Sequence, residues 1–292
     1  MSVMQYAQHL VCPICASQLT HTEGTLSCTQ AHAFDVAREG YVNVLRKKVI
    51  GDTKEMLLAR RNVFAQGHYL PVSDALNEMI AAHLSDRTVQ HNPASPDAIL
   101  DAGCGEGYYL NRLQAYLTSR QLPTTCLGLD VSKDAVRLAA RGCSEAFFLV
   151  ANLKERLAFA DSSFQVIMNI FAPRNLLEFA RVLAPGGLLL VVIPAPAHLQ
   201  QLRAALHLLS IEEHKQQHVV EQFAAQGLFQ LESTRSVEYE LCLRGDEISQ
   251  LVTMTPNYWH FTDEMRRAAS DLSEIRTEIA CLCLAFRRSI CQ

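Results

Sequence analysis

The chain has 292 residues, of which 49% are hydrophobic, and a formal net charge of −4. This size can hold one large α/β domain with a small appendage. The longest apolar run, Leu188 to Ile193, is too short to cross a bilayer, and no apolar leader follows Met1, so we expect a cytoplasmic protein without membrane association. The charge is +2 over residues 1–70, which hold seven Lys and Arg and five Asp and Glu, and −6 over the remainder. Nucleic acid therefore stays open as a partner of the N-terminal part.

The first motif along the chain is a Cys-x2-Cys-x12-Cys-x3-His set, formed by Cys12, Cys15, Cys28 and His32. A Cys-x2-Cys turn places two thiolates on one side of a tight knuckle, and a second knuckle can complete a tetrahedron around zinc. Four protein ligands leave no open position, so the metal is expected to be structural. Free cysteines beside a surface histidine are the alternative, and His21 fits the spacing less well. We predict a zinc-binding domain over residues 1–45.

A basic segment follows over residues 46–70. A local positive field of this kind can meet phosphates even in an acidic protein, although most short charge runs are solvated connecting segments. The two interpretations stay open at this point. The basic residues concerned are Arg46, Lys47, Lys48, Lys54, Arg60 and Arg61.

A glycine turn at residues 101–107, Asp-Ala-Gly-Cys-Gly-Glu-Gly, follows the apolar run Ala98 to Leu100 and precedes a helix-compatible segment. A strand that enters such a turn and a helix that leaves it form a ligand site at the carboxyl edge of a parallel sheet. The spacing is Gly-x-Gly-x-Gly, preceded by Asp101, and not the Gly-x-Gly-x-x-Gly of a dinucleotide site. It favours S-adenosylmethionine over NAD. An ordinary glycine-rich turn is the alternative.

The next strands carry the second half of this cofactor site. Cys126 to Asp130 is a short apolar strand, and a carboxylate at its end can accept both ribose hydroxyls. Ala146 to Val150 reads as a further strand, after which Asn152 is placed to contact an adenine edge. With the turn, these residues predict a cofactor site that includes Asp101, Gly103, Gly105, Glu106, Asp130 and Asn152.

The remaining elements predict a class I, Rossmann-like methyltransferase domain over residues 71–292, with a mostly parallel seven-stranded sheet. Two closing strands are expected at Phe229 to Val237 and Ile279 to Arg287, with a long insertion from Tyr239 to Ser270 over the carboxyl edge. Residues 90–97 are expected to form a loop. The segment after strand 164–170 lacks the Asn/Asp-Pro-Pro-Tyr/Phe motif of many amino-methylating enzymes, which argues mildly against an exocyclic amine as acceptor.

Several motifs together resemble the bacterial 23S rRNA (guanine-N1)-methyltransferases, and the overall pattern is nearer to the Gram-negative type. The resemblance extends over nearly the whole chain. The motifs are the cysteine and histidine knuckles, Phe-Asp-x-Ala-x-Glu-Gly-Tyr-Val-Asn at 34–43, Gly-Asp at 51–52, Ala-Arg-Arg at 59–61, Gly-His-Tyr at 67–69, the glycine turn at 101–109, Gly-Leu-Asp-Val-Ser-Lys at 128–133, Pro-Ala-Pro-Ala-His-Leu at 194–199, Leu-Arg-Gly-Asp-Glu at 243–247, and Met-Thr-Pro at 254–256 with Trp259.

The resemblance implies a zinc-containing enzyme that methylates N1 of a guanine in a hairpin of 23S rRNA, with homodimers among its relatives. It implies Tyr69, Gly105, Glu106 and His198 as contacts to S-adenosylmethionine. Guanine N1 carries a hydrogen, so a general base is needed, and the candidates in the insertion are Asp246, Glu247 and His260. A small-molecule methyltransferase of the same fold and an inactive RNA-binding protein are the alternatives.

Overall fold

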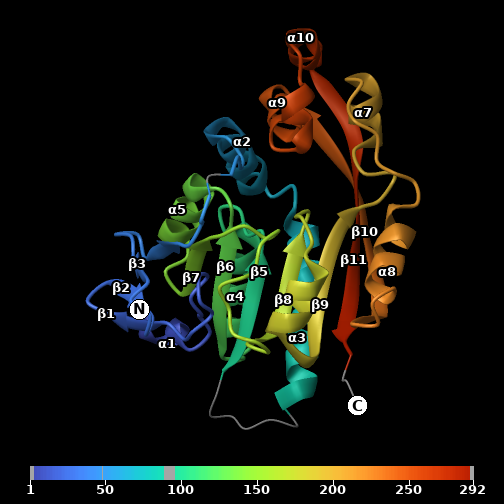
Figure 1. Cartoon of the computed structure of the whole chain (residues 1–292). Coiled ribbons are helices and arrows are strands. Elements are labelled where there is room, and N and C mark those ends of the chain that lie inside the picture. The colour runs from blue at the N-terminus through green and yellow to red at the C-terminus, as the bar shows by residue number, and fades with distance from the viewer. Residues whose placement is uncertain (1–2, 48, 89–95, 290–292) are drawn as a thin grey trace.

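The computed structural model describes residues 3–47, 49–88 and 96–289. Figure 1 shows a small N-terminal unit beside a large α/β unit, and a long hairpin that rises above one end of the sheet. Lys48 of the basic segment and residues 90–95 of the expected loop lie outside the described residues. Within the described ranges, no helix combines the length and the apolar character needed to span a bilayer.

The large sheet has eight strands in the order β10-β11-β9-β8-β5-β6-β7-β4. From the central β5 the chain adds β6 and β7 on one side and then β8 and β9 on the other, all in parallel. Where the direction of winding reverses, the loops leaving β5 and β8 diverge and open a crevice at the carboxyl edge. The strands are β4 (Tyr41–Asn43), β5 (Asp97–Ala102), β6 (Thr124–Asp130), β7 (Ala146–Val150), β8 (Phe164–Ile170), β9 (Leu183–Pro194), β10 (Phe229–Arg244) and β11 (Glu274–Arg288).

The class I architecture is confirmed, but the sheet has one strand more than the seven predicted. The additional strand is β4, which comes from the N-terminal part of the chain and pairs in parallel with β7, with Val42 opposite Leu149. Val42 is completely buried in this position. A strand of three residues thus covers an edge of the parallel sheet that would otherwise expose unpaired backbone groups.

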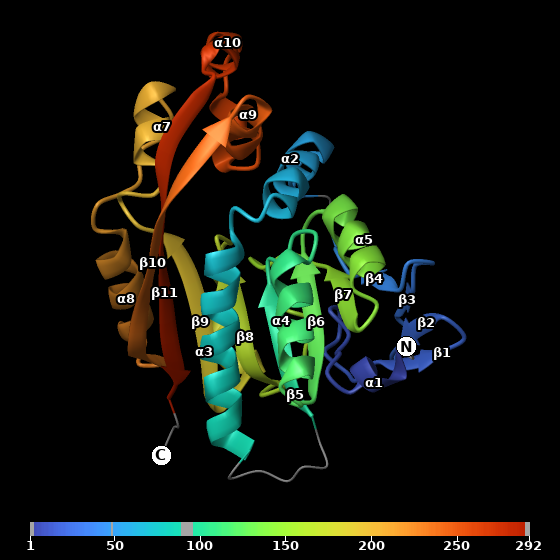
Figure 2. The ribbon, with the colours of Figure 1, turned by 180° about the vertical axis from the view of Figure 1, so that it is seen from behind.

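Helices cover both faces of the sheet and bury one core on each. One core contains apolar side chains from three helices that lie on the face seen in Figure 2, namely α3 (Leu70–Thr88), α4 (Tyr108–Ser119) and α5 (Lys133–Gly142). The other contains apolar side chains of α6 (Leu176–Val182), α8 (Lys215–Ala224) and the N-terminal unit. Because both faces are covered, the central strands read as nearly continuous apolar runs.

The antiparallel hairpin β10–β11 is longer than the sequence predicted. Residues Tyr239 to Arg244, assigned to an insertion, continue β10 and pair with β11 as far as Glu274. That assignment was wrong. Only residues 281–287 of β11 also pair with β9, so the outer part of the hairpin is a two-stranded ribbon. Such a ribbon lacks the apolar run by which a central strand is recognised in a sequence. The tip of the hairpin holds α9 (Asp246–Thr253), the 3-10 helix η1 (Pro256–His260) and α10 (Asp263–Asp271).

The N-terminal unit contains α1 (Met4–Ala7) and a three-stranded antiparallel sheet of β1 (Thr20–Thr22), β2 (Thr25–Ser27) and β3 (Ala33–Asp35). It docks on the β7 side of the large sheet, where the ring of Tyr6 stacks on Phe147 at 5.2 Å. The Tyr6 hydroxyl also donates a hydrogen bond of 2.9 Å to the carbonyl of Glu145. After β4, the chain continues through α2 (Lys54–Ala65) to α3, so that α2 lies above the carboxyl edge (Figure 1).

Candidate functional site

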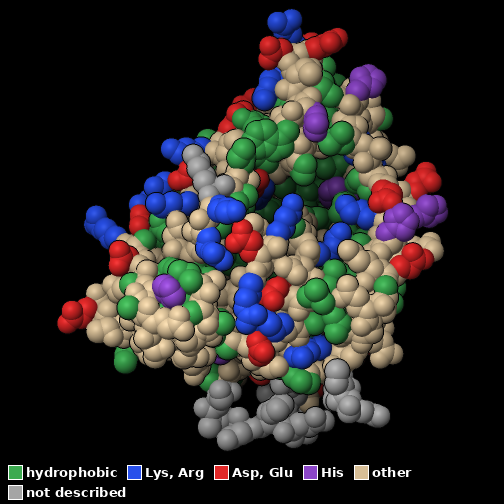
Figure 3. Space-filling view, viewed as in Figure 1, with side chains coloured by type: hydrophobic (Ala, Val, Ile, Leu, Met, Phe, Trp, Pro, Cys, Tyr) green, Lys and Arg blue, Asp and Glu red, His purple; other side chains and the backbone are tan. Residues whose placement is uncertain are grey.

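A cleft of about 890 Å³ lies at the carboxyl edge of the parallel strands. Its floor is formed by the loops that leave β5, β6, β8 and β9, and its upper wall by α2 and the residues after α9. The space-filling view shows this hollow with apolar side chains inside it and charged side chains around its rim (Figure 3). A cleft at the point where strand order reverses is the usual ligand site of an open α/β sheet.

Each glycine of the turn after β5 is required for a different local reason. Gly103 has φ +96°, and a Cβ atom there would lie 2.4 Å from the Cβ of Ala172. Gly105 has φ +54° and lies under the guanidinium of Arg60. Gly107, with φ +83°, is the N-cap of α4, and a Cβ atom there would lie 3.0 Å from the Cβ of Ala139. The loop can therefore pass close to a ligand while β8 and α5 pack against it.

Asp130, at the end of β6, lies directly beside this turn. Its Oδ2 accepts a hydrogen bond of 3.0 Å from the Gly105 amide, and its Oδ1 accepts one of 2.8 Å from the Ser132 amide. Burial raises the pKa of the carboxyl, while the two amide donors oppose this effect. The carboxylate also lines the cleft, so its remaining lone pairs are available to vicinal hydroxyl groups of a ligand.

Arg60 of α2 enters the cleft between acidic side chains, although the sequence placed it in the basic segment. Its guanidinium lies 2.6 Å from Asp52 and 3.8 Å from Glu106, and it donates a hydrogen bond of 3.2 Å to the carbonyl of Met254. Burial raises the pKa of Glu106, and the positive charge of Arg60 opposes that change. Arg60 thus connects α2, the glycine turn and the tip of the hairpin. Nothing in the sequence indicated that Arg60 would contact Glu106 and Met254, which lie far from it along the chain.

Asp101 is the acidic residue before the first glycine, and it lies beneath the cleft instead of lining it. Its side chain is 1% exposed, and neither carboxylate oxygen has a hydrogen-bond partner within the described part of the chain. Burial, with smaller contributions from Asp130 and Glu106, raises its pKa to about 8. We therefore expect Asp101 to be protonated at neutral pH, a prediction taken up in the Discussion.

His198 and Tyr69 form a second, aromatic part of the cleft, with ring centroids 6.5 Å apart. The Nδ1 atom of His198 accepts a hydrogen bond of 3.2 Å from the amide of Ala280. Burial, with the charges of Arg203 and Lys215, lowers the pKa of His198 to about 4. The imidazole is therefore neutral with its proton on Nε2, which makes it a hydrogen-bond donor and not a base at neutral pH.

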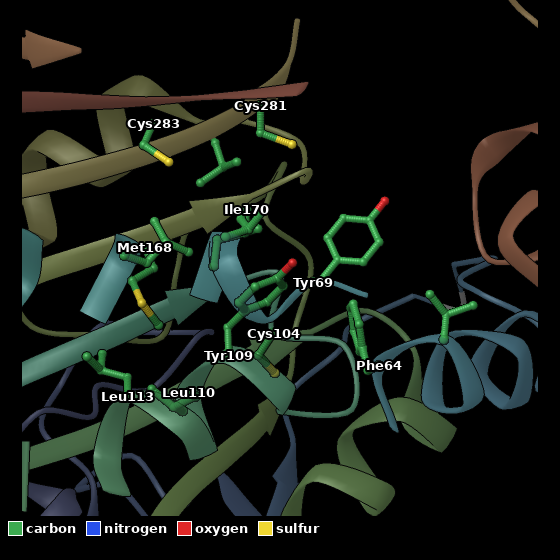
Figure 4. Packing of buried hydrophobic residues seen from close by; sticks show 14 of the residues in the cluster. Phe64, Tyr69, Cys104, Tyr109, Leu110, Leu113, Met168, Ile170, Cys281 and Cys283 are labelled. Carbon is green, nitrogen blue, oxygen red and sulfur yellow. The ribbon is translucent and has the colours of Figure 1, made fainter. Parts of the chain in front are cut away.

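Phe171, which the sequence did not single out as a site residue, follows β8 in a left-handed conformation with φ +51°. The ring is 44% exposed and lines the cleft, 6.2 Å from His198 and 6.3 Å from Tyr69. Tyr69 also packs edge to face against Phe64, with ring centroids 5.6 Å apart (Figure 4). A non-glycine residue in this backbone region is uncommon, and such conformations concentrate at functional sites.

Asn152 lines the cleft, but its side chain is engaged within its own turn. The Oδ1 atom accepts a hydrogen bond of 3.0 Å from the Lys154 amide, and Nδ2 donates one of 3.3 Å to Glu155. The backbone around Asn152 lies just after the end of β7, at the border of the cleft. The contact of Asn152 with an adenine edge stays a prediction.

The three candidate bases of the insertion do not line the cleft. Asp246 and His260 are exposed, and Glu247 accepts a hydrogen bond of 2.8 Å from the Arg244 amide and lies 3.5 Å from His68. The residues that the hairpin tip contributes to the cleft are instead Met254, Thr255 and Trp259, among others. Strand β10 is longer than predicted, and it carries the acidic residues away from the sheet edge.

The four residues of the knuckle motif come together in the N-terminal unit, with ligand atoms all within 4.8 Å of one another. The Nδ1 atom of His32 lies 3.5 Å from the sulfur atoms of both Cys12 and Cys28, and the sulfur of Cys15 lies 3.6 Å from that of Cys28. A zinc tetrahedron with Zn–S bonds of ~2.3 Å has edges of roughly 3.7 Å. The donor set and its spacing therefore fit a structural zinc ion.

Comparison with known proteins gives two matching family models. A zinc-ribbon model described as "RlmA, N-terminal" matches residues 10–48, and a model described as "Methyltransferase domain" matches residues 99–187. The 23S rRNA (guanine(748)-N(1))-methyltransferase of Streptomyces fradiae is 37% identical over 271 residues, which cover 92% of each chain. A Micromonospora griseorubida protein, named as a candidate 23S rRNA (guanine-N(1)-)-methyltransferase, is 40% identical over 97% of this chain and 98% of its own.

Proposed function

Since the chain belongs to the 23S rRNA (guanine-N1)-methyltransferase family, we propose that its cleft transfers the methyl group of S-adenosylmethionine to N1 of a guanine in 23S rRNA. The observation that carries this proposal is the glycine turn with the carboxylate of Asp130 hydrogen-bonded beside it. The zinc ribbon and the methyltransferase domain belong to one chain, as in an enzyme that must hold a polynucleotide.

The residues of the cleft fit the cofactor. When bound, S-adenosylmethionine supplies an electrophilic methyl group on a positively charged sulfur atom. Asp130 would accept hydrogen bonds from the ribose hydroxyls, and the turn around Gly105 would lie against the cofactor. The Oε1 atom of Glu106 is buried without a hydrogen-bond partner among the described residues, so a donor or a cation is needed to satisfy it. Tyr69 and the Nε2 hydrogen of His198 complete the cofactor wall.

We assign Phe171 to the target base. Its exposed ring lines the cleft next to His198 and Tyr69. Bases extruded from RNA commonly stack on aromatic side chains, and guanine N1 is accessible only when the base is unpaired or extruded. We therefore place the target guanine in a hairpin. Orientation of N1 toward the methyl group is the main catalytic contribution of the cleft.

Removal of the N1 proton is a separate requirement. His198 is not suited to accept it, because Nδ1 already accepts the Ala280 amide and Nε2 carries the proton. Asp246, Glu247 and His260 lie outside the cleft. We infer that solvent water accepts the N1 proton and that hydrogen-bond donors near O6 stabilise the deprotonated guanine.

The function is tested by methyl transfer from labelled S-adenosylmethionine. The acceptors are unmodified 23S rRNA as naked RNA, assembled ribosomal subunits that lack the modification, and a small-molecule extract. We expect the label in 23S rRNA at guanine N1. Transfer to a metabolite alone would favour a small-molecule enzyme, and cofactor binding without any transfer would favour an inactive RNA-binding protein.

The cofactor assignment has its own test in Asp130→Ala. We expect this variant to lose S-adenosylmethionine binding in isothermal titration calorimetry and to keep its zinc content, because the ribbon lies on another part of the molecule. Asp134→Ala, on the adjacent helix α5, changes a carboxylate that does not line the cleft and is the matched control. Normal cofactor affinity in Asp130→Ala would show that the ribose contact is misplaced.

We also propose that the enzyme acts in the cytoplasm as a homodimer, with two copies around one hairpin, as the resemblance implies. Light scattering after size-exclusion chromatography, with and without the RNA hairpin, measures this directly. A monomer in both samples would contradict it.

A further inference from the structure

Acidic and basic side chains line different ends of the cleft. The end around the glycine turn is acidic through Asp52, Glu106 and Asp130. The outer end is basic, because Arg174 in the loop after β8, Arg203 in α7 (Gln200–Ala205) and Lys215 at the start of α8 line the same cleft. Figure 3 shows lysine and arginine side chains gathered around the rim of the hollow.

None of these three cations forms an ion pair within the described part of the chain, although the charge of Glu212 acts on Lys215; Arg60, in contrast, lies against Asp52 and Glu106. Burial lowers the pKa of Arg174 and of Arg203. Burial and the nearby charge of Arg174 lower the pKa of Lys215. Partly buried cations that also repel one another are unfavourable unless an anion joins them, so the arrangement is typical of a site for a negatively charged ligand.

The three side chains differ in how far contacts within the protein already hold them. The Arg203 guanidinium donates hydrogen bonds to the carbonyls of His198 and Pro196, so it mainly holds the loop before α7. Glu212, whose charge acts on Lys215, forms its ion pair with His218, at 2.5 Å. Arg174 and Lys215 therefore remain available to a ligand.

We propose that Arg174 and Lys215, supported by Arg203, bind a phosphate group of the RNA backbone next to the target guanine. This inference rests on the proposed function. Phe171 precedes Arg174 by three residues, so a base on its ring and the phosphate of the same or the adjacent nucleotide can be held by one loop. A backbone phosphodiester and the carboxylate of the cofactor each carry one negative charge, so the two anions are separated by the test below.

The position of the proposed phosphate site indicates how RNA lies on the protein. The zinc ribbon docks beside β7, whereas α8 packs against β10. Strands β7 and β10 lie toward opposite edges of the sheet. A phosphate site at α8 means that the RNA crosses the carboxyl edge of the sheet. The ribbon and its basic connector then hold one side of the RNA, and the methyltransferase domain holds the other.

The test measures binding of a 23S rRNA hairpin to Arg174→Gln, Lys215→Gln and the double variant over a series of salt concentrations. Each phosphate contact contributes roughly 0.7 to 0.9 to the slope of log K against log salt, which corresponds to roughly fivefold in affinity at about 0.15 M salt. We expect the double variant to lose roughly 0.7 to 0.9 from the slope, because both side chains bind the same phosphate, and each single variant to lose less. Lys215→Arg should retain the slope, since it keeps the charge. Arg120→Gln, an exposed cation at the far end of α4, is the matched control.

The cofactor is tested separately by calorimetry on the same variants. Unchanged S-adenosylmethionine affinity with a reduced salt slope supports the phosphate site. A reduced cofactor affinity with an unchanged slope would identify the anion as the cofactor carboxylate and overturn the inference. An unchanged slope, in a parent protein that methylates 23S rRNA, would also overturn it while leaving the function intact. A parent protein that does not bind the RNA would instead refute the proposed function.

Discussion

Replacing Asp101 with asparagine is expected to remove a pH dependence from the stability of the protein. Asp101 is buried without hydrogen-bond partners among the described residues, and burial raises its pKa to about 8. An acid with a higher pKa in the folded than in the unfolded chain binds more protons when folded. Its contribution therefore makes the free energy of unfolding fall as pH rises from about 4 to about 8, and level off beyond.

The size of this effect follows from the shift. One pKa unit corresponds to about 1.4 kcal/mol, so a shift of about four units destabilises the folded protein by roughly 6 kcal/mol once the carboxyl is ionised. Between about pH 5 and about pH 7 the loss is roughly 2.5 kcal/mol. Asparagine has nearly the same shape and does not titrate. Asp101→Asn should therefore be more stable than the parent at neutral pH, by an amount that shrinks toward acidic pH.

Urea unfolding followed by circular dichroism, without cofactor, measures the two proteins across this pH range. The cofactor is left out because a bound cation near the glycine turn would favour the ionised form of Asp101. Asp86→Asn makes the same substitution at an exposed position of α3 and serves as the matched control. If the difference between parent and Asp101→Asn does not change with pH, Asp101 is ionised and paired in the folded protein, and the argument from its burial fails.

Three further substitutions test the rest of the site. Gly103→Ala should destabilise the fold by more than about 2 kcal/mol in urea unfolding, because φ is +96° and the new Cβ would overlap that of Ala172; a stable variant with normal cofactor affinity would contradict this. Cys15→Ser should lower the zinc content measured by atomic absorption and unfold the ribbon, since ligation supplies roughly 10 to 16 kcal/mol in such modules; full zinc content would point to another ligand set. Phe171→Ala should lower kcat/KM for RNA by roughly tenfold with unchanged cofactor affinity, as expected for a lost base stack; loss of cofactor affinity instead would place Phe171 against S-adenosylmethionine.

The sequence determined the features that depend on local chain geometry. The Cys-x2-Cys knuckle and the spacing to Cys28 and His32 fix a compact ligand set, because a tight turn brings neighbouring side chains to one side. In the same way, Gly103 and Gly107 could be identified as turn residues, since only glycine adopts these backbone conformations without strain. The alternation of strands and helices was enough to predict a mostly parallel sheet.

Only the tertiary structure decided which distant residues meet. Val42 joins the large sheet because β7 offers an uncovered edge, and no pattern within a three-residue strand signals that partner. Arg60 turns inward because Asp52, Glu106 and the Met254 carbonyl converge on it from three parts of the chain. Glu247 lies away from the cleft because the hairpin carries it there. Such contacts depend on packing between elements far apart in sequence, whereas the motifs depend on residues only a few positions apart.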